Sequence, residues 1–353
     1  MSKRVLLGMS GGVDSSTSAI ILKEKGYEVI GATMRLWEEN ENIEPESIKD
    51  AKRVCDRLGI EHHVIDLRKE FKENVIDNFI CTYMCGKTPN PCVECNKFMK
   101  FGIFYKFAKK LNCEYIATGH YAKIEYSEKY NQFVLTKSNE EKKDQTYFLY
   151  GIDREILSHI IFPLSDFNNK EEIRVIAEKN DLDIAKKKES QEVCFIPDNN
   201  YVGFLKKNKE GFKNENRPGK IILSNGDVLG EHSGIINYTV GQRKGLGISY
   251  KEPLYVIKLD KNKNNVIVGT EQELYCKDLL ANELNFLLDI DLSKKMEVKA
   301  KIRYRAKEAE ATLEVNNDIA KLKFKDPQRA ITPGQSVVFY IDDNIVLGGG
   351  KII

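Results

Sequence analysis

The first 120 residues alternate between short apolar runs and stretches with helical spacing. Residues 4–9 (RVLLGM), 28–37 (EVIGATMRLW) and 62–67 (HHVIDL) have the length and composition of buried strands. Between them, apolar residues recur every three or four positions, as from Ile48 to Leu58, which is typical of a helix packed on a sheet. Strands that alternate with helices predict a parallel, doubly wound α/β sheet.

The same alternation continues toward residue 190. Residues 71–80 and 98–111 have helical spacing, and residues 114–122 (EYIATGHYA) have the pattern of a fourth strand. We interpret the aromatic side chains of the second helix as core rather than as a surface for stacking bases. Residues 151–190 are expected to be largely helical.

Beyond residue 205 the helical spacing gives way to short strand-like runs separated by turn sequences. These runs are KIILS (220–224), INYTV (236–240), LYVIKL (254–259) and NVIVGT (265–270). The pattern predicts an all-β half composed of two small β domains. We expect a catalytic domain over 1–205, a central β domain over 206–280 and a C-terminal barrel-like domain over 281–353.

Composition narrows the class of protein. The chain has 353 residues, 41% hydrophobic and 31% charged, and no apolar run of about 18 residues that would span a membrane. The first residues lack the pattern of a secretory signal, so we expect a cytoplasmic protein. The net charge of +2 and the eight cysteines indicate neither a generally basic surface nor a disulfide scaffold.

A Gly-rich segment lies between the first expected strand and the first expected helix. It consists of Gly8, Met9, Ser10, Gly11, Gly12, Val13, Asp14 and Ser15. Backbone N–H groups of such a turn, together with the helix N-terminus, form an anion site. The segment matches neither a Walker A loop nor a G-x-G-x-x-G fingerprint. The alternative is a plain turn capped by Asp14 or Ser15.

This segment resembles the SGGxDS loop of the PP-loop ATP pyrophosphatases. Those enzymes split ATP into AMP and pyrophosphate to adenylate a substrate, which implies ATP as a cofactor and Asp14 as a Mg²⁺ contact. Met34 and Gly119, at the carboxyl ends of expected strands, correspond to positions that flank the adenosine. The loop alone leaves open amide-forming synthetases and several tRNA-modifying enzymes.

Longer motifs, in order along the chain from Gly8 to Gly350, resemble the tRNA-specific 2-thiouridylase family. They are GKTPNPCVECNKFMKFG, ATGHYA, KDQTYFL, SQEVCFIP, YTVGQRKGLGI, KIRYR and DPQRAITPGQSVVFY. That family replaces the 2-carbonyl oxygen of a wobble uridine in tRNA with sulfur. It uses ATP and a persulfide supplied by an upstream donor protein, so the resemblance implies tRNA and such a donor as partners.

The resemblance assigns roles to two distant cysteines. Cys95 corresponds to the nucleophile and Cys194 to the residue that carries the persulfide, so we expect them to meet at the ATP site. Because the thiolate is the reactive form, Lys97, His120 or a helix N-terminus is expected to lower their pKa. The positions that correspond to contacts with tRNA or the target base are Asn90, Pro91, Cys92, His120, Asp144, Gln145, Thr146, Arg303, Tyr304 and Gln335.

Cys92 departs from most members of the family, which carry aspartate at this position, so the role of that acid is in doubt here. Cys92, Cys95 and Cys194 are candidate ligands of a 4Fe–4S cluster with one iron open to a sulfide. A cluster-free persulfide relay is the alternative, and loss of a cluster in air would leave a Cys95–Cys194 disulfide. The spacing of Cys81, Cys85, Cys92 and Cys95 would also suit a zinc site. Against this alternative, Cys81 is expected on the buried face of a helix.

The remaining cysteines are interpreted as packed thiols, namely Cys55, Cys113 and Cys276. His62 and His63 open a strand and are interpreted as bystanders. In KAKIRYRAK, residues 299–307, cations alternate with other residues, so a strand would direct every cation to one face for binding phosphates. That alternation directs Tyr304 inward, and a solvated outer strand face is the alternative.

Two other functions stay open. An amidating synthetase with the same ATPase fold would leave Cys95 and Cys194 without a role, and no glutaminase motif is recognised. A zinc-ribbon RNA-binding protein without catalysis would leave the SGGVDS loop unexplained. ATP-dependent thiolation of a wobble uridine, giving 2-thiouridine, AMP and pyrophosphate, is therefore the favoured hypothesis.

Overall fold

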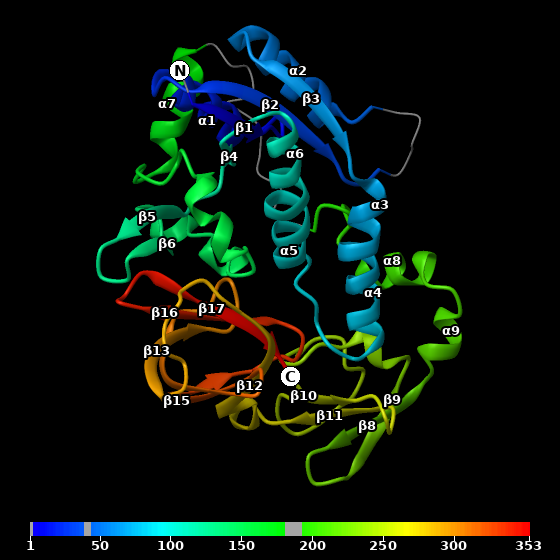
Figure 1. Cartoon of the computed structure of the whole chain (residues 1–353). Helices are drawn as coiled ribbons and strands as arrows, with labels where there is room; N and C mark the ends of the chain where they lie inside the picture. The colour runs from blue at the N-terminus through cyan, green and yellow to red at the C-terminus, as the bar shows by residue number, and fades with distance from the viewer. Residues whose placement is uncertain (1–2, 39–43, 181–192) are drawn as a thin grey trace.

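The computed structural model describes residues 3–38, 44–180 and 193–353. Its N-terminal part contains a five-stranded parallel sheet in the order β3-β2-β1-β4-β7. The strands are β1 (Arg4–Gly8), β2 (Glu28–Arg35), β3 (Glu61–Asp66), β4 (Tyr115–Ala117) and β7 (Ile160–Ile161). Figure 1 shows this sheet at one end of the molecule. The predicted parallel α/β sheet is confirmed.

Helices cover both faces of this sheet. Strand side chains alternate between the two faces. Accordingly, Leu6 of β1 belongs to the core that includes α6, whereas Val5 and Leu7 belong to the core formed with α1, α2 and α7. The bounds of these helices are α1 (Val13–Glu24), α2 (Glu46–Leu58), α6 (Phe104–Lys110) and α7 (Lys170–Lys179).

Two long helical runs stand between the parallel sheet and the β half of the molecule (Figure 1). The first consists of α3 (Arg68–Phe71), a π-helical segment (Lys72–Ile76) and α4 (Asp77–Met84). The second consists of α5 (Pro91–Glu94), a π-helical segment (Cys95–Ile103) and α6. π-Helical segments are rare in proteins overall, but those that occur often lie at functional sites. The segment Cys95–Ile103 begins at a candidate catalytic cysteine.

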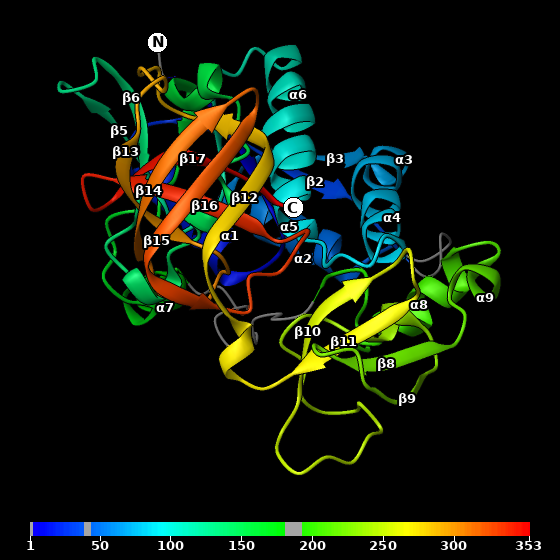
Figure 2. The same ribbon diagram turned by 90° about the horizontal axis from the view of Figure 1, so that it is seen from below.

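The β half contains a four-stranded sheet and a barrel, which lie side by side in Figure 2. The four-stranded sheet has the order β10-β11-β8-β9 and follows α8 (Tyr201–Asn208) and α9 (Phe212–Glu215). Its strands are β8 (Gly219–Leu223), β9 (Val228–His232), β10 (Tyr255–Asp260) and β11 (Asn265–Gly269). The predicted all-β second half is thus confirmed.

The barrel closes because β12 pairs with both β15 and β17. Its strands are β12 (Tyr275–Phe286), β13 (Met296–Lys301), β14 (Ala309–Asn316), β15 (Ile319–Arg329), β16 (Ser336–Ile341) and β17 (Ile345–Ile352). A hairpin of β5 (Lys123–Ser127) and β6 (Gln132–Thr136) joins the barrel sheet at β17, although it lies far upstream in the sequence. The expected boundaries after residues 205 and 280 stay predictions.

Three expectations about local structure are wrong. β13 ends at Lys301 and the chain turns after it, so the cations of residues 299–307 do not share one strand face. Residues 236–240 form no strand, because a 3₁₀ turn occupies Ile235–Asn237. Residues 151–180 are only partly helical, since a 3₁₀ segment (Arg154–His159) and β7 precede α7. Residues 181–190 of that expected helix lie outside the described residues.

Three short 3₁₀ segments complete the elements: Glu141–Lys143, Thr146–Phe148 and Gln272–Leu274. Within the described ranges, no helix combines the length and the apolar character needed to cross a membrane.

Candidate active site

The Gly-rich segment forms a tight turn between β1 and α1. The Ser10 N–H donates to the Ser15 hydroxyl (3.2 Å), and the Ser15 hydroxyl donates to the Gly12 carbonyl (3.1 Å). Gly11 has φ +69°, and a Cβ there would lie 2.7 Å from Ser47 O and from Asp50 Cβ. No described side chain caps α1 at Gly12, which argues against the alternative of a plain turn capped by Asp14 or Ser15. The helix N-terminus therefore keeps its anion-binding character.

Asp14, the expected Mg²⁺ contact, is held by two side chains that the sequence did not suggest. The Tyr121 hydroxyl donates to its Oδ1 (3.0 Å), and Lys170 Nζ lies 3.3 Å from its Oδ2. Lys170 is the first residue of α7 and its side chain is only 11% exposed. A cation this close to the loop offers a second positive group for phosphates, beside any metal that Asp14 binds.

Met34 and Gly119 lie where the sequence predicted ligand contacts. Met34 is half-buried at the carboxyl end of β2, and Gly119 follows β4 by two residues. A Cβ at Gly119 would lie 3.0 Å from the backbone carbon of Asp14 and 3.1 Å from Ser15 N. Gly119 thus allows the chain after β4 to approach the start of α1 closely, at the edge where doubly wound sheets bind ligands.

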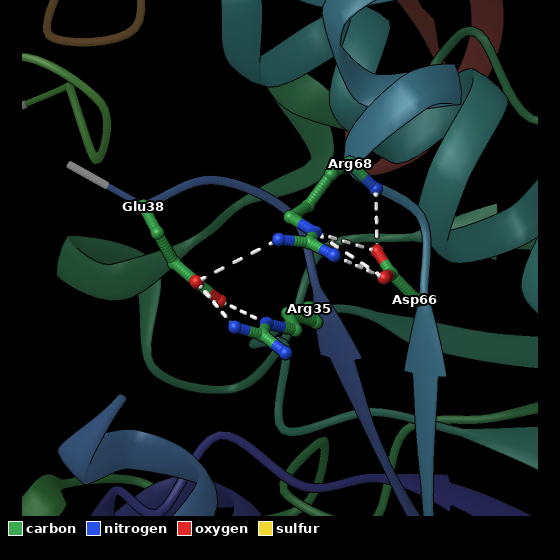
Figure 3. Close-up of polar contacts among 4 residues, drawn as sticks. All are labelled: Arg35, Glu38, Asp66 and Arg68. Carbon is green, nitrogen blue, oxygen red and sulfur yellow. Dashed lines mark hydrogen bonds and ion pairs between the residues drawn. The ribbon is translucent and has the colours of Figure 1, made fainter. Parts of the chain in front are cut away.

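An ion-pair network, missed by the sequence reasoning, lies beside this edge (Figure 3). Arg68 Nη2 lies 2.6 Å from Asp66 Oδ2, and Arg35 binds Glu38. Arg68 also approaches Glu38, at 3.9 Å. The hydrogen bond from Arg35 lowers the pKa of Glu38, and the one from Arg68 lowers the pKa of Asp66. The network connects the ends of β2 and β3 to the segment that follows Met34.

The segments that carry the three expected thiols pack in one buried core, which includes Val93, Cys95 and Phe195. Cys92 lies in α5, Cys95 begins the π-helical segment, and Cys194 lies on the short segment that precedes α8. Phe195, the residue after Cys194, packs edge-to-face on Phe71 and Phe79 and so anchors this segment.

The expectation of depressed thiol pKa values is wrong in this conformation. Burial raises the pKa of Cys95 to about 11, and the nearby Lys100 only partly opposes this. Neighbouring protein atoms also displace water from the thiols of Cys92 and Cys194 and raise the pKa of each, again against Lys100, although both residues keep an exposed surface. Among the described residues, the cation at the thiols is Lys100, whereas Lys97 is exposed with Nζ 5.2 Å from the Phe98 ring centroid. Desolvation thus outweighs the positive charge of Lys100.

His120 is buried next to Lys100 and cannot act as the expected cation. Its Nε2 lies 3.5 Å from Lys100 Nζ, and its Nδ1 lies 2.7 Å from the Thr118 hydroxyl. Burial and then the charge of Lys100 hold the pKa of His120 well below its ordinary value. A neutral imidazole therefore lies next to Lys100.

The loop that leads into α5 is fastened to the barrel. Gln335 donates to the carbonyls of Thr88 (3.1 Å) and Pro89 (2.9 Å). Lys351 of β17 lies 3.0 Å from the carboxylate of Glu94, which is 8% exposed. These contacts hold Asn90, Pro91 and Cys92, the expected contacts of the target base, against the barrel. Gln335 itself acts on the loop, and its contact with tRNA stays a prediction.

A second group of expected tRNA residues, called the second wall below, comprises Asp144, Gln145, Thr146, Arg303 and Tyr304. Asp144 is buried and accepts from the N–H (3.2 Å) and the hydroxyl (2.8 Å) of Thr146. Tyr304 stacks obliquely on Phe148, with ring centroids 4.5 Å apart, and is partly buried, although the strand from which its inward direction was predicted ends at Lys301. Asp144 and Thr146 do not reach the surface in this conformation, so their contact with tRNA stays a prediction.

Gln145 and Arg303 bind backbone groups in the same wall. Gln145 Oε1 accepts from the Tyr121 N–H (3.0 Å). Arg303 Nη2 donates to the Arg329 carbonyl (2.8 Å) and to the Ala330 carbonyl. Both residues thus hold neighbouring segments of the protein in place, and their contact with tRNA also stays a prediction.

The zinc alternative does not fit the described residues. Among them, no three His, Cys, Asp or Glu side chains come together as metal ligands would. Cys81 is exposed, contrary to expectation, and lines a cavity of about 190 Å³ with Cys85 and Glu94. Cys276 is also exposed rather than packed, whereas Cys55 and Cys113 are buried as expected.

Asn96 is a further polar group that the sequence reasoning missed. Its Nδ2 donates to the Phe148 carbonyl (3.1 Å), which ties the Cys95 turn to the second wall. Its Oδ1 is buried and has no hydrogen-bond partner among the described residues. Such orphaned acceptors are uncommon in folded proteins.

A parallel sheet with a Gly-rich anion loop, followed by two β units, defines a nucleotide-binding α/β protein of the PP-loop type. Family models match the chain as a tRNA methyl transferase HUP domain (residues 3–198), a tRNA methyl transferase PRC-barrel domain (209–270) and an aminomethyltransferase beta-barrel domain (276–352). The chain belongs to the tRNA-specific 2-thiouridylase family, as its curated relatives establish.

One such relative is the tRNA-specific 2-thiouridylase MnmA of Clostridioides difficile (strain 630), which is 46% identical over 360 residues. The match covers 100% of this chain and 98% of that protein. Another is the tRNA-specific 2-thiouridylase MnmA 1 of Caldanaerobacter subterraneus subsp. tengcongensis, 47% identical over 362 residues, with 100% and 98% covered. Similarity thus extends along the whole chain.

Among solved structures, the U34-tRNA thiolase NcsA from Methanococcus maripaludis, with its 4Fe–4S cluster, aligns with a TM-score of 0.37 and 19% identity. The alignment covers 59% of this chain and 67% of that chain. A similarity at this level carries no conclusion about cofactors.

Proposed function

We propose that this chain is an ATP-dependent tRNA sulfurtransferase that converts a wobble uridine to 2-thiouridine. The observation that carries the proposal is that Cys95 and Phe195, the neighbour of Cys194, belong to one buried core although they lie far apart in sequence, in a chain whose parallel sheet has an anion-binding loop. Membership in the 2-thiouridylase family over the full chain supports the same function. An amidating synthetase would leave this pair of thiols without a role.

The first step uses the phosphate loop. The uridine 2-carbonyl oxygen attacks the α-phosphorus of ATP and releases pyrophosphate, which turns a poor leaving group into AMP. Residues Gly8 to Ser15 bind the phosphates through backbone N–H groups, and Lys170 neutralises charge beside them. Mg²⁺ bound at Asp14 would neutralise further negative charge on the phosphates, and the carboxylate oxygens of Asp14 suit that ion. Met34 and Gly119 flank the adenosine.

The second step uses the thiols. A persulfide on Cys194 attacks the activated carbon through its terminal sulfur and displaces AMP. The Cys95 thiolate then attacks the Cys194 sulfur, which forms a Cys95–Cys194 disulfide and leaves the terminal sulfur on the base as 2-thiouridine. Because the pKa of Cys95 is raised to about 11 by burial, the step requires tRNA binding to bring further positive charge or solvent to this thiol.

A 4Fe–4S cluster on Cys92, Cys95 and Cys194 is the finer expectation from sequence. Within the described residues these three thiols do not form a metal-ligand group, and Cys92 and Cys194 are exposed. These thiols are thus not placed to hold a single metal ion; the cluster stays a prediction, and the relay above takes no step through it. Iron and sulfide analysis of protein purified without oxygen tests this point.

The partners follow from the chemistry. A tRNA supplies the uridine, and Asn90, Pro91, Cys92, Arg303 and Tyr304 are proposed contacts. An upstream protein that carries a persulfide supplies the sulfur to Cys194, which its exposure permits. Because both partners are expected in the cytoplasm, we propose that location for the chain.

The test combines labelled ATP, a persulfide donor and unmodified tRNA. The proposal predicts release of one pyrophosphate per 2-thiouridine, with both products dependent on tRNA. Pyrophosphate release that depends on ammonia, with no thionucleoside, would instead support an amidating synthetase. Binding of tRNA without any ATP turnover would support a non-catalytic RNA-binding protein.

A further inference from the structure

One sequence motif has no role in the proposed reaction, namely YTVGQRKGLGI, residues 238–248. It begins the long connection between the 3₁₀ turn at Ile235–Asn237 and β10, in which residues 238–254 form neither helix nor strand. Figure 2 shows this connection projecting beyond the four-stranded sheet. Residues 243–254 of the connection are called the cationic loop below.

Both ends of the cationic loop are fixed to the rest of the protein. The Gly241 N–H donates to the Val256 carbonyl (2.8 Å), and the Val256 N–H donates to the Gln242 carbonyl (2.9 Å). Leu246 and Leu254 of the loop are buried in the same core as Val256. The loop therefore presents its other side chains on a preformed surface, which lowers the entropic cost of binding a ligand.

The base of the loop adjoins the segment that Arg303 holds. Val240 and Tyr255, on either side of the loop, pack with Ala330 in one small apolar cluster. Arg303 donates to the carbonyls of Arg329 and Ala330. Because Arg303 is a proposed contact of tRNA, the cationic loop is connected through Ala330 to the second wall, where tRNA is expected.

Three cations of the loop have no acidic partner. Arg243, Lys244 and Lys251 are exposed, and none of them forms an ion pair with a side chain in the described ranges. Glu252 is the one acid between residues 241 and 254. Because the net charge of the whole chain is only +2, a surface for a polyanion has to be local, and this loop provides one.

The loop also surrounds a hollow that suits a nucleotide base. The hollow has a volume of about 490 Å³, and the described residues that line it all belong to the cationic loop. One of them is Tyr250, which is 39% exposed and has Lys251 Nζ 5.8 Å from its ring centroid. Pockets of about 300–1,000 Å³ accept small ligands, and exposed aromatic rings stack on unpaired bases. A ring beside cations thus matches the base and the phosphate of one nucleotide.

We propose that the cationic loop binds tRNA outside the active site. Phosphates bind at Arg243, Lys244 and Lys251, and an unpaired base enters the hollow against Tyr250. The loop supplies affinity and takes no part in adenylation or sulfur transfer. The inference rests on the proposed function, in which tRNA is the substrate. An acidic surface of the persulfide donor is the other possible occupant, and Tyr250 with its hollow favours RNA because an unpaired base can stack there.

The test measures binding of unmodified tRNA without ATP over a range of salt concentrations. Arg243→Ala combined with Lys244→Ala is expected to weaken binding roughly tenfold at about 0.15 M salt. The slope of log Kd against log salt is expected to fall by about 1–2, because each lost phosphate contact removes roughly 0.7–0.9 from it. The matched control is Lys109→Ala combined with Lys110→Ala, which removes two adjacent exposed cations from the end of α6 and is expected to change Kd less than about twofold.

The aromatic ring is tested separately from the charges. Tyr250→Ala is expected to weaken binding roughly tenfold without changing the salt slope, because stacking involves no phosphate, and Tyr250→Phe is expected to retain the affinity. In turnover assays, the variants of the loop are expected to raise the KM for tRNA while the KM for ATP stays within about twofold of wild type.

Equal losses in the loop variants and in the α6 control, or an unchanged salt slope after the loss of Arg243 and Lys244, would overturn the proposal. Intact tRNA affinity with slower loading of Cys194 by the persulfide donor would also overturn it, by assigning the loop to the donor. The proposed function fails in a different way: wild-type protein would bind tRNA with the expected salt dependence but form no 2-thiouridine.

Discussion

The phosphate loop and the thiol centre are built in opposite ways. The loop is one continuous segment from Gly8 to Ser15, closed by hydrogen bonds among its own residues. The thiol centre unites Cys92 and Cys95 with Cys194, whose segment is anchored through Phe195. The backbone turn of the nucleotide half is thus set by local hydrogen bonds, whereas the sulfur half depends on contacts between distant parts of the chain.

This difference matches the chemistry of the two halves. Adenylation requires a preformed set of donors around phosphates, since such donors gain their effect from being in place before charge develops. Sulfur transfer requires a thiol that meets the donor, the base and the other thiol in turn. An exposed Cys194 beside a buried Cys95 suits that sequence of encounters.

The largest expected effect separates the two halves completely. Cys95→Ala and Cys194→Ala are each expected to lower 2-thiouridine formation by roughly 10³-fold or more, because each removes a reacting sulfur. Pyrophosphate release in the presence of tRNA is expected to continue. Measuring both products in one reaction checks this, with Cys85→Ala as control; loss of both products together would show that the halves are not separable.

The next effect concerns the pH dependence of the inner thiol. Because the pKa of Cys95 is raised to about 11, this thiol is protonated at neutral pH, and its thiolate fraction rises about tenfold per pH unit below that value. At pH 7 its alkylation is expected to be roughly 10²-fold slower than in the unfolded chain. Rates from pH 7 to 10, assigned by peptide mapping, check this. A plateau below pH 9 would contradict it.

A third change tests the close packing of the loop against the start of α2. Gly11→Ala places a Cβ against Ser47 O and Asp50 Cβ at φ +69°, so it is expected to destabilise the fold by about 1–3 kcal/mol. Pyrophosphate release is expected to fall roughly tenfold, mainly through a higher KM for ATP. Gly12→Ala, whose Cβ would meet only Ser10 Oγ at 3.5 Å, is the steric control for stability. Equal stability of the two variants would refute this explanation.

The smallest effect on activity tests how the barrel supports the cysteine helix. Lys351→Met leaves the carboxylate of Glu94 without its partner at 3.0 Å, and this is expected to lower the free energy of unfolding by about 2 kcal/mol. The cost is smaller than for a fully buried ion pair because the Lys351 side chain is 22% exposed. The rate of thiolation is expected to fall a few-fold while the KM for ATP is unchanged. Lys351→Arg is expected to restore both quantities. A change in KM for ATP alone would contradict this role.

The sequence predicts the fold and the loop well because their signals are local. Apolar runs identify β1, β2 and β3, and the glycines directly after β1 identify the turn. The alternation of residues 299–307 was misleading, because the chain turns after Lys301, and alternation cannot reveal where a strand ends. Nothing in the sequence of β5 and β6 indicates that they pair with β17.

The sequence predicted which cysteines belong to the thiol centre, but not which residues surround them. Motif resemblance identified Cys95 and Cys194, but the neighbouring cation is Lys100 rather than Lys97 or His120. Burial decides the pKa of each thiol, and burial arises from packing between the helical run and the segment before α8. The contacts of Lys170 and Lys351 likewise join elements that are distant in sequence.

The most direct test counts thiols in a single turnover. Enzyme carrying one persulfide on Cys194 is mixed with ATP and tRNA without reductant, and free cysteines and 2-thiouridine are then measured together. The relay predicts one new disulfide per 2-thiouridine, with Cys95 always one of its two members. Formation of 2-thiouridine while Cys95 stays a free thiol would contradict it.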